Sequence, residues 1–266
     1  KKAKSDNIEG GLYQSEIYSY TYKKKVTQLL SREWLPAGSR VLILDDFMAN
    51  GEAVRGLCDL VSQAGAELVI YNYRLVTEAG AQDAYLPMKD EVIDLDALGL
   101  DNYFYRYWMP YVHGQEAWCR LYKREIIEQN HLRYAPNDEV FAEDTLFSAM
   151  YLMHVHTIAA LAKPYVNYLQ RGDSLMGMRK PKLCARLINL SIRLAQYVSE
   201  CGREKELKHV LPVLCYDKLI CKGIRLDPSL EDVCDAMNRA GQNATLRALL
   251  KELLSPLPLL MYTLKT

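Results

Sequence analysis

Residues 41–53 read VLILDDFMANGEA, and this stretch decides the predicted fold. The apolar run Val41–Leu44 is typical of a short strand that is buried on both faces of a sheet. Residues 51–64 then carry apolar side chains at helical spacing, and Glu67–Tyr73 indicates a second strand. We therefore predict a strand–helix–strand unit over residues 40–73, with the right-handed parallel crossover that such units adopt.

The segments on either side of this unit contain two predicted hairpins. Alternating β-forming residues between positions 11 and 32 predict a hairpin that turns at Lys23-Lys24-Lys25. Residues 157–161 and 165–169 are β-like runs on either side of Lys163-Pro164, and we expect them to pair as a second hairpin.

Helical spacing dominates the last third of the chain. After Pro181 we expect helices over residues 182–200, 204–222, 229–240 and 243–254. The predicted fold class is an α/β N-terminal unit, with a partial parallel sheet and a hairpin, followed by a mainly α-helical C-terminal region.

Composition and charge exclude several classes of protein. The chain has 266 residues, and its 33 basic residues balance 33 acidic ones, so the net charge gives no reason to expect nucleic acid as a partner. No apolar run approaches the ~20 residues of a membrane-spanning helix, so we expect no membrane span. The chain begins at Lys1 without a signal peptide or a Met, which we interpret as a piece of a cytoplasmic protein.

The cysteine pattern argues against a disulfide framework and against a thiolate metal site. Seven cysteines are scattered along the chain, and none forms a C-x-x-C pair. We expect buried thiols and no metal site built from protein ligands alone.

Two carboxylates, Asp45 and Asp46, follow the first predicted strand, and a loop of small residues leads from them into the predicted helix. Ligands bind at this edge of open α/β sheets. Adjacent carboxylates can accept hydrogen bonds from sugar hydroxyls or hold water on Mg²⁺, and loop amides at a helix start can bind phosphate. The pattern predicts a sugar-phosphate site, and the alternative is a pair of solvated acids before an ordinary helix.

The string DDFMANG at Asp45–Gly51 is similar to the phosphoribosyl-pyrophosphate (PRPP) motif of type I phosphoribosyltransferases, most of all the xanthine-specific ones. The resemblance spans about residues 1–69 and includes Tyr18–Thr21 and Lys1–Ser5. It implies that Asp45 and Asp46 hold the ribose hydroxyls of PRPP. It also implies phosphate binding by Ala49, Asn50, Gly51, Glu52 and Ala53, and a pyrophosphate contact from a lysine among Lys1, Lys2 and Lys4.

This resemblance implies transfer of a phosphoribosyl group to a purine base in purine salvage, with Mg²⁺ and without an organic cofactor. It also implies a homodimer. The segment Val69–Thr77 departs from the family, because it does not look like the family's base-binding segment.

A different resemblance begins at about residue 70 and continues to about residue 180. The strings WCRLYK at 118–123, FAEDTLF at 141–147 and YLQRGDSLM at 168–176 look like the later half of family-2 glycosyltransferases. The resemblance implies that Asp144 is the general base for inverting transfer from a nucleotide sugar to an acceptor, with Glu143 beside it in the substrate site. The alternative is that both acids only satisfy free N–H groups at a helix start.

Three weaker patterns are interpreted as structural. Asp94-Leu95-Asp96 fits a metal-binding D-x-D literally, but we expect a helix N-cap there. His154 and His156 have no apparent third ligand. The aromatic cluster around Trp108 could line an acceptor site, and we expect it to be core; it comprises Tyr103, Phe104, Tyr105, Tyr107, Trp108 and Tyr111.

The sequence thus predicts a composite of three segments: 1–69 from a phosphoribosyltransferase, 70–180 from a glycosyltransferase, and a helical region over 181–266. Phosphoribosyl transfer ranks first because its motif is the more specific, glycosyl transfer is the alternative, and a non-enzymatic helical interaction module is the third hypothesis. Each site looks incomplete, so we expect ligand binding without efficient turnover.

Overall fold

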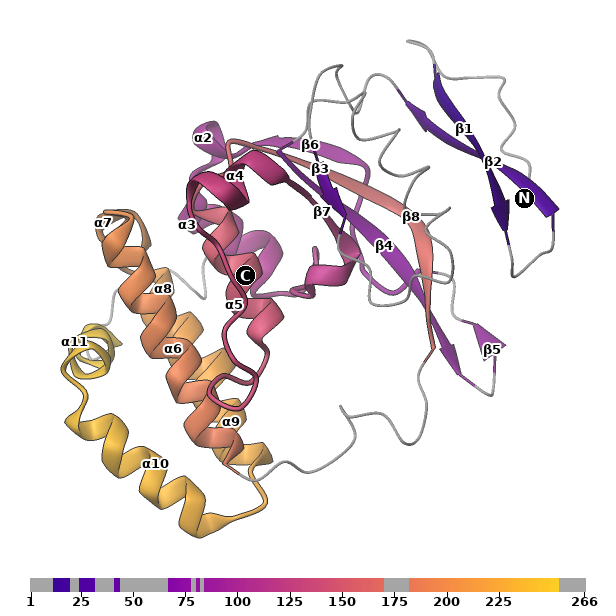
Figure 1. Cartoon of the computed structure of the whole chain (residues 1–266). Helices are drawn as coiled ribbons and strands as arrows, with labels where there is room; N and C mark the ends of the chain where they lie inside the picture. Colours follow the sequence, from indigo (N-terminus) through magenta and orange to yellow (C-terminus); the bar gives the residue numbers. More distant parts are fainter. Residues whose placement is uncertain are drawn as a thin grey trace.

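The computed structural model describes residues 12–19, 24–31, 41–43, 67–77, 80–81, 84–169 and 182–253. The predicted N-terminal hairpin is confirmed as a two-stranded antiparallel sheet of β1 (Leu12–Ser19) and β2 (Lys24–Ser31) (Figure 1). Ser19 pairs with Lys24. The predicted turn residues Lys24 and Lys25 therefore belong to β2 instead.

One six-stranded sheet forms the centre of the α/β part (Figure 1). Its strand order is β3-β7-β4-β8-β6, and β5 pairs with the end of β4. The strands are β3 (Val41–Ile43), β4 (Leu68–Thr77), β5 (Gly80–Ala81), β6 (Glu91–Asp94), β7 (Arg120–Lys123) and β8 (Thr157–Leu169).

The sheet is mixed, which corrects the predicted parallel sheet. Strand β7 pairs antiparallel with both β3 and β4, so β3 and β4 run in the same direction with β7 between them. Among the described strands, β4 and β8 are the parallel neighbours. Strands on both sides of residue 69 therefore share one sheet, while the predicted helix over 51–64 lies outside the described residues.

The predicted hairpin at Lys163-Pro164 is wrong, because residues 157–169 form the single strand β8. Pro164 pairs with Asn72 of β4 where the register shifts on both sides of Asn72. Proline cannot donate to a strand ladder, so it is tolerated at such an irregularity. The buried Asn72 side chain bonds both backbone groups of Leu86, accepting from its N–H (2.9 Å) and donating to its carbonyl (2.7 Å).

Short helical segments connect the central strands. Four residues of the predicted aromatic core are confirmed as buried, while Tyr107 and Tyr111 are partly buried and pack against it. Tyr103, Phe104, Tyr105 and Trp108 are each at most 1% exposed. The segments are α2 (Leu95–Leu98), α3 (Leu100–Tyr103), the π-helical η1 (Phe104–Trp108), the 3₁₀ turn η2 (Ala117–Cys119), α4 (Arg124–Gln129) and α5 (Glu143–Leu152).

The C-terminal region is helical, as predicted, and is arranged around α6 (Leu183–Glu200). Leu187, Leu194 and Val198 are buried on its inner face, which fits its amphipathic pattern. Helix α6 packs against α5 and against later helical segments, seen beside it in Figure 1. These segments include α9 (Cys221–Leu226), α10 (Leu230–Gln242) and α11 (Ala244–Leu253).

The predicted helix over 204–222 is broken into several pieces. These are α7 (Glu204–Leu207), α8 (Val210–Val213), the π-helical η3 (Leu214–Ile220) and the start of α9. Gly223 allows α9 to pack closely on α6, because a Cβ there would lie 2.9 Å from the Cα of Cys184. The close approach of α9 to α6 therefore requires glycine at this position.

Within the described helices, none has the length and apolar character needed to cross a lipid bilayer. The six cysteines of the described segments are free, and Cys119, Cys184 and Cys215 are buried.

Candidate functional site

All of the predicted PRPP-site residues lie outside the described part of the chain. This applies to Lys1, Lys4, Asp45, Asp46, Ala49, Asn50, Gly51, Glu52 and Ala53. Strand β3, which leads into Asp45, is described and lies beside β7. The roles predicted for these residues stay predictions.

Glu143 and Asp144 are described and form the first turn of α5, as the sequence predicted. Both side chains are half-buried. Asp144 Oδ1 accepts a hydrogen bond from the backbone N–H of Thr145 (2.8 Å). Ala142 precedes the helix with φ 62°, a left-handed conformation that costs a non-glycine residue of the order of 1–2 kcal/mol. Such strained backbone is concentrated at functional sites, which makes this turn a candidate site.

The charge of Asp144 acts on a thiol and a phenol, those of Cys119 and Tyr134. Burial raises the pKa of the Cys119 thiol to about 12; Arg120 opposes this shift, and Glu116 and Asp144 add to it. The pKa of Tyr134 is also raised to about 12, mainly by burial and then by the charges of Asp144 and Glu143. The two groups on which the Asp144 charge acts therefore stay protonated at neutral pH.

The loop that carries Cys119 is held by a buried arginine. The Arg120 guanidinium is 1% exposed and donates to the carbonyls of Glu116, Gly114 (2.8 Å) and His113 (3.3 Å). Gly114 has φ +63°, and a Cβ there would lie 2.6 Å from Glu116 Oε2, so this turn needs glycine. Arg120 belongs to a family string, but the string did not reveal this role, because an arginine two residues after a tryptophan carries no sign of burial.

An aromatic surface lies towards the carboxyl ends of the parallel strands β4 and β8. Trp118 stacks on Tyr168 of β8 with centroids 5.2 Å apart and an interplanar angle of 7°. Tyr73 of β4 contacts Trp118 edge-on (4.6 Å) and stacks on Tyr85 (5.0 Å), which is 43% exposed. Sequence reasoning considered only the Trp108 cluster for such a surface. The alternation of Tyr71 and Tyr73 along β4 was the available signal.

The D-x-D candidate is structural, as predicted. Asp94 is the N-cap of α2 and accepts from the N–H of Ala97 (3.0 Å). Asp96 lies 2.8 Å from Nδ1 of His156. Throughout the described segments, no group of three or more histidine, cysteine, aspartate or glutamate side chains is arranged to hold a metal ion.

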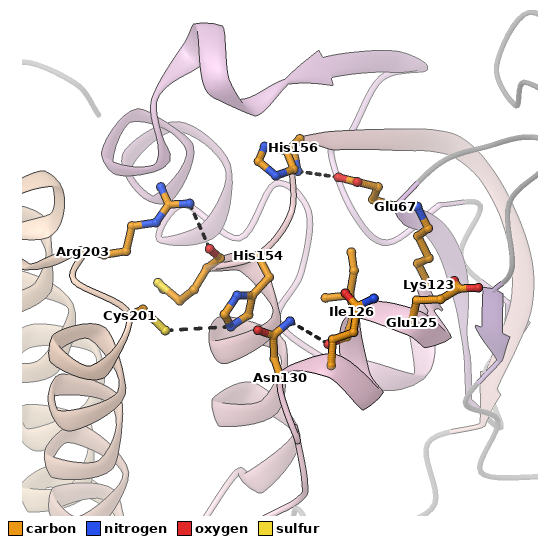
Figure 2. Close-up of a pocket in the computed structure, with 11 residues that line it drawn as sticks. Glu67, Lys123, Glu125, Ile126, Asn130, His154, His156, Cys201 and Arg203 are labelled. Atoms are coloured by element: carbon orange, nitrogen blue, oxygen red, sulfur yellow. Dashed lines mark hydrogen bonds between the residues drawn. The ribbon is translucent and has the colours of Figure 1, made fainter.

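A cavity of about 750 Å³ is drawn in Figure 2. It includes Met153 and His154 just after the C-terminal end of α5, whereas Asp144 lies in the first turn of that helix. Ten residues of helix separate these two ends by ~15 Å. The cavity is lined by Glu67, Lys123, Glu125, Ile126, Gln129, Asn130, Met153, His154, His156, Cys201 and Arg203. His154 Nε2 is hydrogen-bonded to the Tyr197 hydroxyl (2.7 Å), which agrees with its predicted structural role.

A scan for known protein families finds none that matches this chain. Sequence relatives are the xanthine phosphoribosyltransferase of Bifidobacterium animalis subsp. lactis, 38% identical over 100 residues, and xanthine phosphoribosyltransferase 1 of Clostridium perfringens, 40% identical over 100 residues. Each match covers 38% of this chain, and 51% and 52% of the relatives. The chain thus spans about half the length of the curated relatives that it matches.

A solved structure with a similar fold is that of residues 1–349 of S. aureus TarS in complex with UDP-GlcNAc. The TM-score is 0.51 at 15% identity, and the match covers 75% of this chain and 56% of TarS. Both resemblances are therefore confirmed: phosphoribosyltransferases by sequence, over part of the chain, and a family-2 glycosyltransferase by fold. The sequence relatives are transferases, and the likeness to TarS is one of fold.

Proposed function

We propose that the described part of the chain is the acceptor side of an inverting glycosyltransferase that uses a nucleotide sugar. The observation that carries this proposal is the half-buried Asp144 carboxylate in the first turn of α5, a helix that contacts the Ala117–Cys119 turn, where Trp118 stacks on Tyr168 of β8. Ligand sites of α/β sheets lie at the carboxyl ends of parallel strands. The fold likeness to TarS supports the same assignment.

In this proposal Asp144 takes the proton of the acceptor hydroxyl while the hydroxyl oxygen attacks C1 of the donor sugar. The bond from C1 to the nucleoside diphosphate breaks, and the diphosphate leaves with the electron pair. The N-terminus of α5 stabilises a carboxylate charge at this position. Cys119 and Tyr134, whose pKa values are raised, stay protonated and do not compete as bases.

The test is the Asp144→Asn variant, with Asp138→Asn in the exposed preceding loop as its matched control. We expect nucleoside diphosphate release from common nucleotide sugars to be well below the ~10 s⁻¹ median for enzymes. Whatever rate the chain shows should fall by at least ~100-fold in Asp144→Asn, since general bases contribute ~10²–10⁴. Asp138→Asn should match the parent chain, and an equal rate in Asp144→Asn would refute the assigned base.

A second function is favoured by a specific observation, the 38–40% identity to xanthine phosphoribosyltransferases over 100 residues. We propose that Asp45 and Asp46 bind the ribose of PRPP, and that Ala49–Ala53 bind its phosphate. Carboxylate donors suit a Mg²⁺ ion that enters with PRPP.

Replacing both Asp45 and Asp46 by asparagine should weaken PRPP binding in the presence of Mg²⁺ by at least ~10-fold. Hydrogen bonds to charged groups are worth ~1.5–3 kcal/mol each. Isothermal titration calorimetry measures the change, and the Asp144→Asn variant should bind PRPP as the parent chain does. Equal affinity in the parent chain and the double variant would contradict this assignment.

A further inference from the structure

The cavity of Figure 2 is built from segments far apart in the sequence, and neither proposed function uses it. Figure 2 shows Glu67, Lys123 and Glu125 on one side, Cys201 and Arg203 on the other, and His154 between them. A volume of about 750 Å³ lies within the ~300–1,000 Å³ range of small-molecule sites.

The first side of the cavity is acidic and preorganised. Glu67 Oε2 accepts hydrogen bonds from the backbone N–H groups of His156 (2.6 Å) and Thr157 (3.3 Å), which fixes its carboxylate. Glu125 adds a second carboxylate, and Lys123 adds one ammonium. This side therefore carries a formal net charge of −1.

The opposite side presents hydrogen-bond donors from Arg203. Its Nη1 donates to Glu206 Oε2 (2.7 Å), and its Nη2 donates to the carbonyl of Met153 (3.0 Å). A guanidinium has five N–H donors, so three are not used by these two bonds. The side chain is 30% exposed, which leaves it accessible to a ligand carboxylate.

The cavity also has an apolar part and a neutral histidine. Ile126 and Met153 are among the lining residues, and they give the cavity a small apolar part. Burial, and then Arg203, lower the pKa of His154. The imidazole is thus neutral at pH 7.5 and adds no charge between the two sides.

We propose that this cavity binds a small linear zwitterion, with its ammonium at Glu67 and Glu125, its carboxylate at Arg203 and its short aliphatic spacer against Ile126 and Met153. The site lies beyond the far end of α5 from Asp144. Binding therefore does not depend on the proposed transfer reactions.

The experiment is a calorimetric titration of the full chain at pH 7.5 with 6-aminohexanoate, hexylamine and hexanoate. These probes share one spacer and differ in their charged ends. We expect 6-aminohexanoate to bind at least ~10-fold more tightly than either of the others. Equal affinities, or no heat from 6-aminohexanoate at millimolar concentration, would overturn the proposal.

Two variants with opposite expected effects on binding affinity locate the site. Glu67→Gln should weaken 6-aminohexanoate binding at least ~5-fold, while its amide oxygen can still accept the bonds from residues 156 and 157. Lys123→Gln makes the acidic side more negative and should tighten binding. Asp144→Asn should leave it unchanged, so failure here is distinct from failure of the proposed transferase function. Unchanged affinity in Lys123→Gln would count against the site even if Glu67→Gln did not fold.

Discussion

Replacing Arg120 by methionine should lower the free energy of unfolding by at least about 3 kcal/mol. Methionine keeps an unbranched side chain of similar length but has no N–H groups. The carbonyls of Glu116, Gly114 and His113 would each lose a donor, at ~1–3 kcal/mol for a buried unsatisfied group. The contact of the guanidinium with the Trp108 ring, 5.3 Å from its centroid, would also be lost.

Urea denaturation followed by far-UV circular dichroism measures this change. Arg124→Met is the matched control, because Arg124 is 67% exposed and its contact is an i,i+4 ion pair with Glu128 (2.6 Å). Such exposed pairs contribute ~0.3–0.5 kcal/mol. If the two variants lost the same stability, Arg120 would not organise the 113–119 loop as we describe.

Acid should destabilise the protein through the buried His113. Burial, and then the charge of Arg120, lower the pKa of His113 to about 3, against ~6.5 in an unfolded chain. Its ring is enclosed by Tyr103, whose hydroxyl lies 3.1 Å from Nδ1, by Tyr107, and by Glu91, 3.7 Å from Nε2. A proton therefore binds the unfolded chain more readily than the folded one.

The sign of the pH dependence follows from this difference. Above pH ~6.5 the ring is neutral in both states, and His113 does not change the stability with pH. Between pH ~6.5 and about 3 the unfolded state binds more protons, so the free energy of unfolding falls as the pH falls. At pH 5 the expected loss is about 2 kcal/mol.

Thermal or urea unfolding at pH 7.5, 6 and 5 tests this expectation. His113→Gln should lower stability at every pH but remove most of the slope between pH 6.5 and 5. The control is His131→Asn, an exposed site with φ 51°, a conformation that asparagine tolerates. A slope that persists in His113→Gln would show that another group dominates acid unfolding.

Local features of this protein could be predicted from sequence because the interactions behind them are local. The alternation of β-forming residues predicted the hairpin of β1 and β2. The helical spacing of apolar residues predicted α6 and α10. The predicted cap at Asp94 is also local, since its side chain accepts from the N–H three residues ahead. The first-turn acids Glu143 and Asp144 belong to the same class, and their family string located them without any tertiary knowledge.

Where residues distant in sequence meet, only the tertiary structure decided the outcome. Lys163-Pro164 looked like a turn, but Asn72 on β4 pairs with Pro164 at a register shift, and β8 continues through it. The predicted helix over 204–222 is divided into pieces, of which η3 and α9 pack on α6. The buried role of Arg120 depends on the loop that folds back over it, and the cavity depends on Glu67, Lys123, His154 and Arg203. Burial and charge pairing are properties of such spatial neighbours, and no spacing along one chain encodes which distant groups will share a site.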